Sequence, residues 1–509
     1  MGTGFRASMD WVHIWAGVVL GGVLFAIFWM GTLSVFDREI DRWMAPMTRL
    51  APAGGPVSVE ALRASYETAA AARASSWFAQ LPTERSPVLQ VTWREGTRQL
   101  VRLFDPVTGA ALPDPGTWAG TGFLYPFHYM LHVRLGYWIV GVAGMAMLLL
   151  CVSGVAIHRK IFADFFTFRA DKQPRRLVLD LHNVTGVLGL PFHFMITLSG
   201  VIIFFGVYFP GTIQFAYGDE VRAFAREAYG NYDRPRLGRP GALASLDAIT
   251  TQASRLWDGE TPRYLFVRQP GDAAAVVQVA RHGEDRVAGR SDIAYFDATS
   301  GALLHQRIAP QPVLSAQRFI AGLHLIQFRH WTLRWVYFVL GLAGCAMIAT
   351  GYLFWLESRK KKDGRLGRRG VRLVETMTVG SVSGVVIATL AFFVSNRLLP
   401  LDMVFLGEDR ASLEIWAFYL VWLASFAHGA LRPRRAWIEQ CGAIATLAFL
   451  AVLLNWSTTG DHLVRSLAEP HLWGVAGIDL LLMGSAALAA WASIALARRS
   501  HATSSLPVR

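Results

Sequence analysis

Histidines cluster at the ends of two long apolar runs near the middle of the chain. Five of them flank or enter the runs 135–157 and 184–208: His128, His132, His158, His182 and His193. Each run is long enough to cross a hydrocarbon core about 30 Å thick at about 1.5 Å per residue. Ionisable side chains are expensive in lipid, and those found there tend to mark functional sites. We therefore expect the chemistry of this protein to reside in these imidazole rings.

The composition is that of an integral membrane protein. Of the 509 residues, 53% are hydrophobic and only 17% are charged, which is far from the average for soluble proteins. We interpret the net charge of +13 as loop charge that orients helices, and we expect no nucleic-acid partner. The cysteines Cys151, Cys345 and Cys441 lie in apolar runs without a C-x-x-C pair, which argues against a cysteine zinc site, an iron–sulfur cluster or a redox disulfide.

The pattern of apolar and polar segments predicts eight membrane spans and two polar domains. Each polar segment has a helical stretch followed by alternating strands, so we expect two α+β domains outside the bilayer. Links rich in Arg and Lys after the second and fourth spans favour the cytoplasm, which places both termini there. The predicted boundaries are 1–36, 121–158, 182–209 and 315–357 for spans one to four, 37–120 and 210–314 for the outer domains, 159–181 and 358–372 for the basic loops, 373–497 for four further helices and 498–509 for the tail.

Roughly the first 360 residues contain an internal repeat. Spans one and three align without a gap, which pairs His13 with His182, Gly17 with Gly186 and Gly31 with Gly200. The polar segments share a turn motif, F-D-P-V-T-G-A at 104–110 and F-D-A-T-S-G-A at 296–302. Because both copies enter the membrane in the same direction, the axis relating them should lie along the membrane normal.

The repeat predicts which histidines face one another. His13 and His182 lie at equivalent inner ends of spans one and three, and His132 and His324 lie at the outer ends of spans two and four. Paired imidazoles from facing helices commonly hold the iron of b-type haem. We predict a mostly α membrane protein with a pseudo-twofold four-helix core that binds two haems through these four histidines. Three arginines near the outer pair could meet haem propionates or an anionic substrate: Arg134, Arg329 and Arg334.

Other pairings stay open. His128 and His132 are i and i+4 on one helical face, so either could be the outer ligand. His182 and His193 would lie within about 20° of each other and about 16 Å apart along one helix, which could then serve two stacked haems. His158 could replace an inner ligand. The alternative reading is that His158 is an interfacial cation and that His193 donates to a neighbouring carbonyl.

Five motifs in order resemble the PepSY-associated transmembrane proteins of bacterial inner membranes. They are H-x-x-x-G opening span one, F-D-P-V-T-G in the first polar segment, F-H-Y-x-L-H before span two, G-V-A-I-H-R-K closing it, and L-D-L-H-N-V-T-G-V-L-G-L-P-F opening span three. The resemblance covers residues 8–360 and implies PepSY-like outer domains, two b-type haems and electron transfer to ferric siderophore in the periplasm. The resemblance implies that the family's recurrent histidines fall at His13, His128, His132, His182 and His324. His158 and His193 match a subset of the family's histidine positions.

The sequence also bears on the electron donor and on other functions. It has no G-x-G-x-x-G after a strand and no Walker A sequence, so electrons would come from a quinol or a cytoplasmic reductase. The outer domains also resemble a module associated with peptidase inhibition, which would make the chain a membrane-anchored peptidase regulator. A siderophore or iron transporter is a third class. A transporter would need acidic or polar residues in the four C-terminal spans, which form an extension of the chain. We expect these spans to be almost free of such residues, with Asp479 as the main exception.

Overall fold

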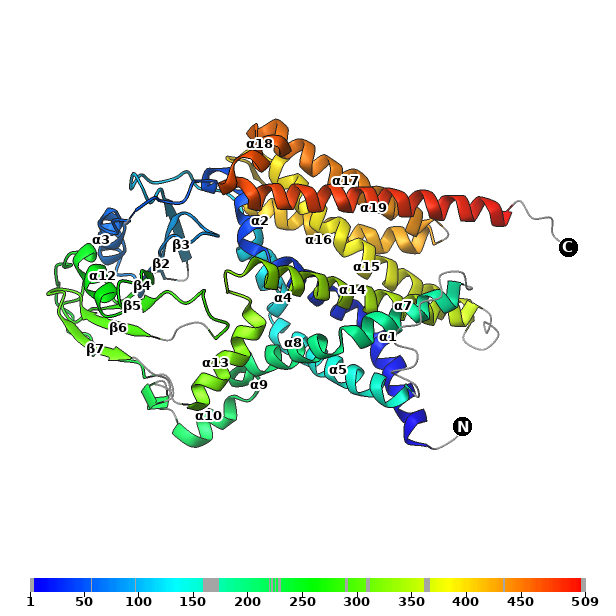
Figure 1. Cartoon of the computed structure of the whole chain (residues 1–509), viewed down its shortest axis with the longest axis horizontal. Coiled ribbons are helices and arrows are strands. Elements are labelled where there is room, and N and C mark those ends of the chain that lie inside the picture. Colours follow the sequence, from blue (N-terminus) through cyan, green and yellow to red (C-terminus); the bar gives the residue numbers. More distant parts are fainter. Residues whose placement is uncertain are drawn as a thin grey trace. The chain divides into compact units, whose positions relative to one another are not determined.

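The computed structural model divides into two compact units (Figure 1). It describes residues 4–55, 57–96, 98–158, 174–218, 220, 223–224, 226–227, 230–288, 292–307, 312–360, 367–433 and 435–504. Met1–Pro46, Gly116–Val201 and Thr332–Arg509 form the first unit, called here the helical unit. Met47–Pro115 and Ile202–Trp331 form the second, the sheet unit.

Long apolar helices make up most of the helical unit. Among the described residues, seven helices are long and apolar enough to cross a membrane, and a bent pair adds an eighth if it crosses as one span. The seven are α1 (Phe5–Ser34), α5 (Gly136–Ile157), α14 (Trp331–Lys360), α15 (Gly367–Leu398), α16 (Arg410–Leu431), α17 (Ala436–Thr459) and α19 (Trp473–Ser504). The bent pair is α7 (Pro174–Leu188) with α8 (Leu190–Ile203), and shorter helices are α2 (Asp37–Met44), α4 (Tyr125–Met130) and α18 (Leu463–Ala468). The predicted multi-pass membrane protein of mostly helical structure is confirmed.

A bend of 62° separates α7 from α8. Pro191 explains it, because proline has no N–H to donate to the preceding turn and its ring clashes with that turn. Gly189 lies at the bend, and a Cβ added there would come within 2.3 Å of Cε1 of His193. The bend thus places the His193 ring against a backbone position that has room only for glycine.

Helix α15, the first of the four C-terminal membrane helices, packs against α1. The indole of Trp29 on α1 donates to the hydroxyl of Thr389 on α15 at 3.0 Å. A Cβ added to Gly22 on α1 would lie 2.5 Å from Oγ of Ser381, so the glycine permits this close approach. Phe25 and Phe393 belong to one continuous buried cluster that spans the two helices. The extra helices are therefore part of the same packed unit as the histidine-bearing helix α1.

The sheet unit contains one antiparallel sheet of seven strands in the order β3-β2-β1-β4-β5-β6-β7. The strands are β1 (Ser76–Gln80), β2 (Leu89–Glu95), β3 (Arg98–Phe104), β4 (Pro262–Arg268), β5 (Val276–Arg281), β6 (Ile293–Asp297) and β7 (Leu303–Arg307). Alternate residues such as Trp77, Val91 and Val267 are buried against α3 (Arg63–Ala71) and α12 (Leu246–Arg255). The described residues of this unit also include the helices α9 (Phe205–Tyr208), α10 (Pro210–Tyr217) and α13 (Pro312–Leu325).

The two polar segments, expected to form two domains, instead share this sheet. Strands β1 to β3 come from the first segment and β4 to β7 from the second, and β1 pairs with β4. Phe78 stands opposite Phe266 at the middle of that antiparallel pair. The internal repeat is thus expressed as two halves of one sheet that meet at β1 and β4.

The shared turn motif folds in the same way in both halves. One side-chain oxygen of each aspartate accepts from the backbone N–H groups two and three residues on, at 2.7 and 3.1 Å for Asp105 and at 2.9 Å twice for Asp297. Gly109 and Gly301 follow with φ of +70° and +72°, a region that favours glycine. Burial would raise the pKa of Asp297, but these bonds and one from Arg234 hold that pKa far below its usual range.

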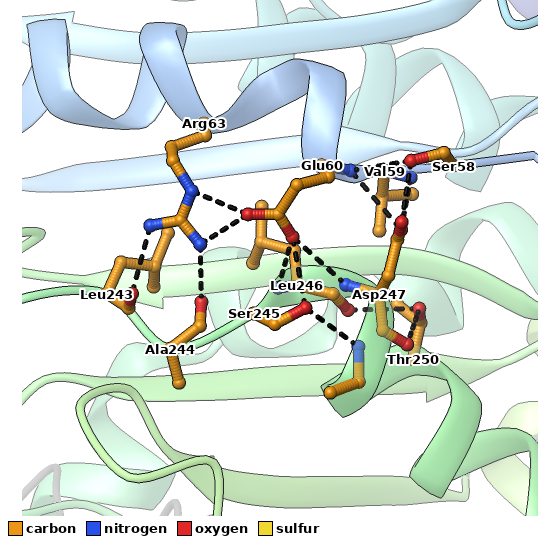
Figure 2. Close-up of polar contacts among 11 residues, drawn as sticks. Ser58, Val59, Glu60, Arg63, Leu243, Ala244, Ser245, Leu246, Asp247 and Thr250 are labelled. Carbon is orange, nitrogen blue, oxygen red and sulfur yellow. Dashed lines mark hydrogen bonds and ion pairs between the residues drawn. The ribbon is translucent and has the colours of Figure 1, made fainter.

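Each half of the sheet unit also caps a helix of the other half (Figure 2). Asp247, at the start of α12, accepts from the backbone N–H of Val59 at 2.7 Å and of Glu60 at 3.2 Å. In return, Glu60 accepts from the backbone N–H of Leu246 at 2.9 Å. Arg63 pairs with Glu60 and donates to two backbone carbonyls of the second half at 2.9 and 3.0 Å. The free N–H groups at these helix starts are therefore satisfied across the repeat.

Candidate functional site

His13 of α1 and His182 of α7 lie side by side in the helical unit. Their ring centroids are 6.4 Å apart and the ring planes meet at 82°. Bonds of about 2 Å from a metal to imidazole nitrogen would place two rings on opposite sides of one ion with centroids about 6 Å apart. The spacing of the two rings therefore fits a shared metal ion.

Both rings are held through Nδ1. Nδ1 of His13 lies 3.0 Å from the hydroxyl of Ser153 on α5, and Nδ1 of His182 lies 2.8 Å from the carbonyl oxygen of Met347 on α14. The Ser153 hydroxyl donates to the carbonyl of Leu149 at 2.7 Å, so its oxygen accepts from the His13 ring. Metal-binding histidines usually donate their second ring N–H to such a partner, which leaves Nε2 as the ligand.

Small residues surround the two rings. A Cβ added to Gly154 would lie 3.3 Å from Cε1 of His13, and one added to Gly351 would lie 3.2 Å from Cε1 of His182. Gly17 and Gly186, one turn after the two histidines, have room for a Cβ with nearest neighbours at 3.9 and 3.4 Å. Glycines thus allow close approach to both rings from neighbouring helices.

The donor set fits haem iron rather than a bare metal ion. Within the described ranges, no three His, Cys, Asp or Glu side chains are grouped so that they could hold a metal ion. A bare ion usually needs about four protein ligands, whereas haem supplies its own in-plane nitrogens and needs only axial ones. Two imidazoles from neighbouring helices would supply the two axial ligands of one haem.

His193 is fully buried on α8, and its Nε2 lies 3.3 Å from the carbonyl oxygen of Leu340 on α14. Its Nδ1 is also buried and has no hydrogen-bond partner in the described part of the chain. The ring packs edge-on to Phe28 of α1 with centroids 5.9 Å apart. The contact with Leu340 agrees with the reading in which this histidine donates to a neighbouring carbonyl.

The prediction that His128 and His132 share a helical face is wrong. Helix α4 ends at Met130, and both Leu131 and His132 are left-handed with φ of +50° and +49°. Nδ1 of His128 lies 2.8 Å from the carbonyl oxygen of Ile27 on α1. The His132 ring instead bonds the carbonyl of Phe123 at 2.9 Å and stacks on that side chain. Of the two, His128 reaches the helix that carries His13.

The other predicted residues are dispersed. His158 follows the end of α5 with its Nδ1 buried and unpartnered in the described structure, and Arg134 is exposed after α4. His324 and Arg329 belong to the sheet unit, on α13 and just beyond it.

Arg334, at the start of α14, is fully buried. It pairs with both carboxylate oxygens of Glu39 on α2, at 2.8 and 3.1 Å, and it donates to the carbonyl of Val35 at 2.7 Å. This guanidinium therefore has protein partners and joins α14 to α2. Removing one member of such a buried pair is strongly destabilising.

Acidic groups in the C-terminal helices were missed by sequence reasoning. The expectation of almost no acid besides Asp479 is wrong, because Glu414 is fully buried on α16 and Glu439 lies in the first turn of α17. Glu414 accepts from the hydroxyl of Thr117 at 2.5 Å, and Asp479 accepts from the indole of Trp43 at 2.8 Å. The available signal was a single acidic residue within or at the start of each apolar run.

Comparison with known proteins matches most of the chain to one protein family. The sequence profile described as the PepSY-associated TM region matches residues 11–358, so it covers α1 to α14 and leaves out α15 to α19. The chain is also similar to an uncharacterized protein of Pseudomonas aeruginosa, with 27% identity over 342 residues. That alignment covers 63% of this chain and 84% of the relative.

Proposed function

Because the chain belongs to the PepSY-associated TM family, we propose that it is a membrane electron-transfer protein that carries haem b. Its reaction would be the reduction of ferric siderophore, Fe3+ to Fe2+, at the periplasmic face of a bacterial inner membrane. The observation that carries the proposal is the pair His13 and His182, with ring centroids 6.4 Å apart in an apolar bundle. Ferrous iron is the more weakly chelated state, so reduction would release the metal.

The chain's own residues have distinct roles in this proposal. His13 and His182 would bind the haem iron, which supplies one-electron Fe3+/Fe2+ chemistry. Ser153 and the Met347 carbonyl hold the two rings in the tautomer and orientation that iron binding needs. The surrounding apolar helices exclude water, which together with axial ligation tunes the potential of such a centre.

A second, outer centre stays a prediction from the sequence. The predicted pair there is His132 with His324, and these residues belong to different units. The contact between His128 and Ile27 on α1 favours His128 over His132 as the ligand from the helical unit. Two centres near opposite faces would let electrons cross the bilayer.

The shared sheet supports eight membrane crossings. Strands β1 to β3 and β4 to β7 pair in one sheet, so the two polar segments lie on the same side of the bilayer. The chain leaves that side through α5 and has to return before β4, and the bent pair α7 and α8 supplies the return. Both ends of the chain then lie on the opposite side, which the basic loops assign to the cytoplasm.

The decisive experiment is a visible absorption spectrum with a haem count per polypeptide for the purified protein. We expect a b-type Soret band and an α band that sharpens on reduction. His182→Ala should lower the haem content by about half, because one of two predicted centres loses a ligand, and His324→Ala should do the same. His330→Ala, an exposed histidine, is the matched control and should leave the haem content unchanged.

Colourless, folded protein would refute the proposal, and unchanged haem in both His182→Ala and His324→Ala would refute the ligand assignment. The alternative functions, a membrane-anchored peptidase regulator and a siderophore or iron transporter, need no chromophore. The same spectrum therefore separates the haem proposal from both alternatives.

A further inference from the structure

A hydrogen-bonded chain of polar side chains connects three of the C-terminal helices. The hydroxyl of Ser383 on α15 lies 2.6 Å from Oε1 of Gln440 on α17, and both residues are buried. The Gln440 amide nitrogen lies 3.3 Å from Nδ1 of His428 on α16. Nε2 of His428 lies 2.8 Å from Glu439, which Arg432 also contacts at 2.6 Å. The chain runs from the inside of the helix bundle to its edge.

The direction of each bond in this chain can be assigned. The Gln440 nitrogen also donates to the carbonyl of Ser425 at 2.9 Å, which identifies that atom as the amide NH2. Nδ1 of His428 therefore accepts, and Nε2 carries the proton that is donated to Glu439. The result is a neutral histidine linked to a carboxylate, an arrangement that can accept and pass protons.

The end of this hydrogen-bonded chain at His428 and Glu439 is partly exposed. The side chains of His428 and Glu439 are each 32% exposed, and they lie in the last turns of α16 and the first turn of α17. If α16 and α17 cross a membrane, these positions at the helix ends would lie near its interfacial layer. Ionisable groups at such a place in membrane helices suggest a function, because burial or lipid contact makes them expensive.

Helix α15 links the helix that carries His13 to this hydrogen-bonded chain. Ser381 on α15 contacts Gly22, which follows His13 on α1, and Gly380 on α15 packs against Phe426 of α16. Helix α15 thus touches both the histidine-bearing helix and the helix that carries His428. The family profile ends at residue 358, so this polar chain belongs wholly to the added helices.

From these observations we propose that the C-terminal helices form a quinol oxidation site at His428 and Glu439. The inference rests on the proposed function, because the electrons need the haem iron as acceptor. An isoprenoid quinol is the class of donor that fits, since it is lipid-soluble and gives up protons together with electrons. Its tail would lie in the bilayer and its hydroxyl groups would donate to the Glu439 carboxylate.

The reaction balances within this arrangement. One quinol loses its two O–H protons and two electrons to become a quinone. The protons pass one at a time to Glu439 and from there to water at the membrane edge. The electrons would pass one at a time to the haem iron that His13 and His182 would hold, so that each quinol would reduce two Fe3+ to Fe2+.

The test compares two similar clusters, one between α16 and α17 and the other at α18 and the link that follows it. Glu439→Gln removes the carboxylate of the proposed site. Glu469→Gln is the matched control, because Glu469 also contacts an arginine and a histidine, Arg465 at 3.1 Å and His471 at 3.5 Å. Both variants are made in the full chain, purified with its haem and placed in lipid nanodiscs.

Two readouts separate this proposal from the haem assignment. The first is quenching of tryptophan fluorescence by decylubiquinol, kept reduced with dithionite, a titration that needs no haem. We expect about tenfold weaker binding for Glu439→Gln and no change for Glu469→Gln, as for the loss of one charge-assisted hydrogen bond. The second is the rate of haem reduction by decylubiquinol, which should fall about tenfold or more in Glu439→Gln, while reduction by dithionite stays unchanged.

Wild-type quinol affinity and wild-type reduction rate in Glu439→Gln would overturn the quinol site and leave the cluster as a structural link between helices. Equal losses in both variants would overturn it as well. If Glu439→Gln does not fold, His428→Gln tests the same pair by the same readouts. Purified protein without haem would refute the proposed function alone, because the fluorescence titration still decides whether quinol binds.

Discussion

His13 and His182 are each held by a hydrogen-bond partner on another helix. The His13 ring of α1 is held by Ser153 of α5, and the His182 ring of α7 is held by the backbone of Met347 on α14. The two partners differ in kind, because a hydroxyl can be removed by substitution and a backbone carbonyl cannot. Substitution can therefore test the partner of the His13 ring but not that of the His182 ring.

Replacing Ser153 by alanine should loosen the His13 ring without removing the ligand. Loss of a partner to a metal-bound histidine typically weakens metal retention by about tenfold or more, so we expect faster haem loss and a shifted midpoint potential. Haem transfer to apomyoglobin and a redox titration would measure both. Ser199→Ala is the control, since Ser199 is also buried and donates to the carbonyl four residues earlier, at 2.7 Å. Identical behaviour of the two variants would contradict the role of Ser153.

At the scale of elements, the most informative feature is the exchange of caps between the two halves of the sheet unit. Asp247 of the second half satisfies backbone N–H groups of Val59 and Glu60 in the first. A helix that depends on a carboxylate from the other repeat is stabilised only when both halves are in place. The effect of substituting Asp247 should therefore appear in a distant part of the sequence.

Asp247→Ala should speed hydrogen exchange at the amides of Val59 and Glu60. Loss of a helix cap removes about 1 kcal/mol, which corresponds to roughly fivefold faster exchange where opening is local. Hydrogen–deuterium exchange with mass spectrometry of the detergent-solubilised protein would resolve the peptide that contains Val59 and Glu60, just before α3, from peptides of α12. Glu67→Ala, an exposed acid on α3, should leave the same peptides unchanged. Faster exchange confined to α12 would argue against the reciprocal cap.

The sequence predicted the membrane helices, the repeat and the family, because periodic apolar runs and repeated motifs are local signals. It could not predict that α4 ends at Met130, since Leu131, the first residue with a left-handed backbone, is not a type that favours that conformation. It also could not predict one sheet in place of two domains. Phe78 and Phe266, which pair in that sheet, are 188 residues apart (266 − 78), and no local pattern specifies such a contact.

At the scale of the whole molecule, the number of crossings decides where the chain ends. Among the described residues, seven helices pass as spans alone, and the bent pair α7 and α8 makes the eighth if it crosses as one span. An even number returns the C-terminus to the side of the N-terminus, whereas an odd number separates them. The shared sheet supports the even number.

Fusions can count the crossings. Green fluorescent protein should fluoresce at either end of the chain, because it folds in the cytoplasm, and alkaline phosphatase should be active when fused after Pro115. A phosphatase fusion at the C-terminus should be inactive. Activity there would mean that α7 and α8 do not cross the bilayer as one span.

Pairing between β1 and β4 has a consequence for biosynthesis. The ribosome completes β1 long before β4 emerges, and α5 and the α7–α8 pair enter the membrane in between. During that interval the edge of β1 that later pairs with β4 has no neighbouring strand. An unpaired strand edge can pair with another chain and so promotes aggregation. Nascent chains stalled after α5 should therefore depend on chaperones and be rapidly degraded, whereas chains that have reached β4 should resist proteases.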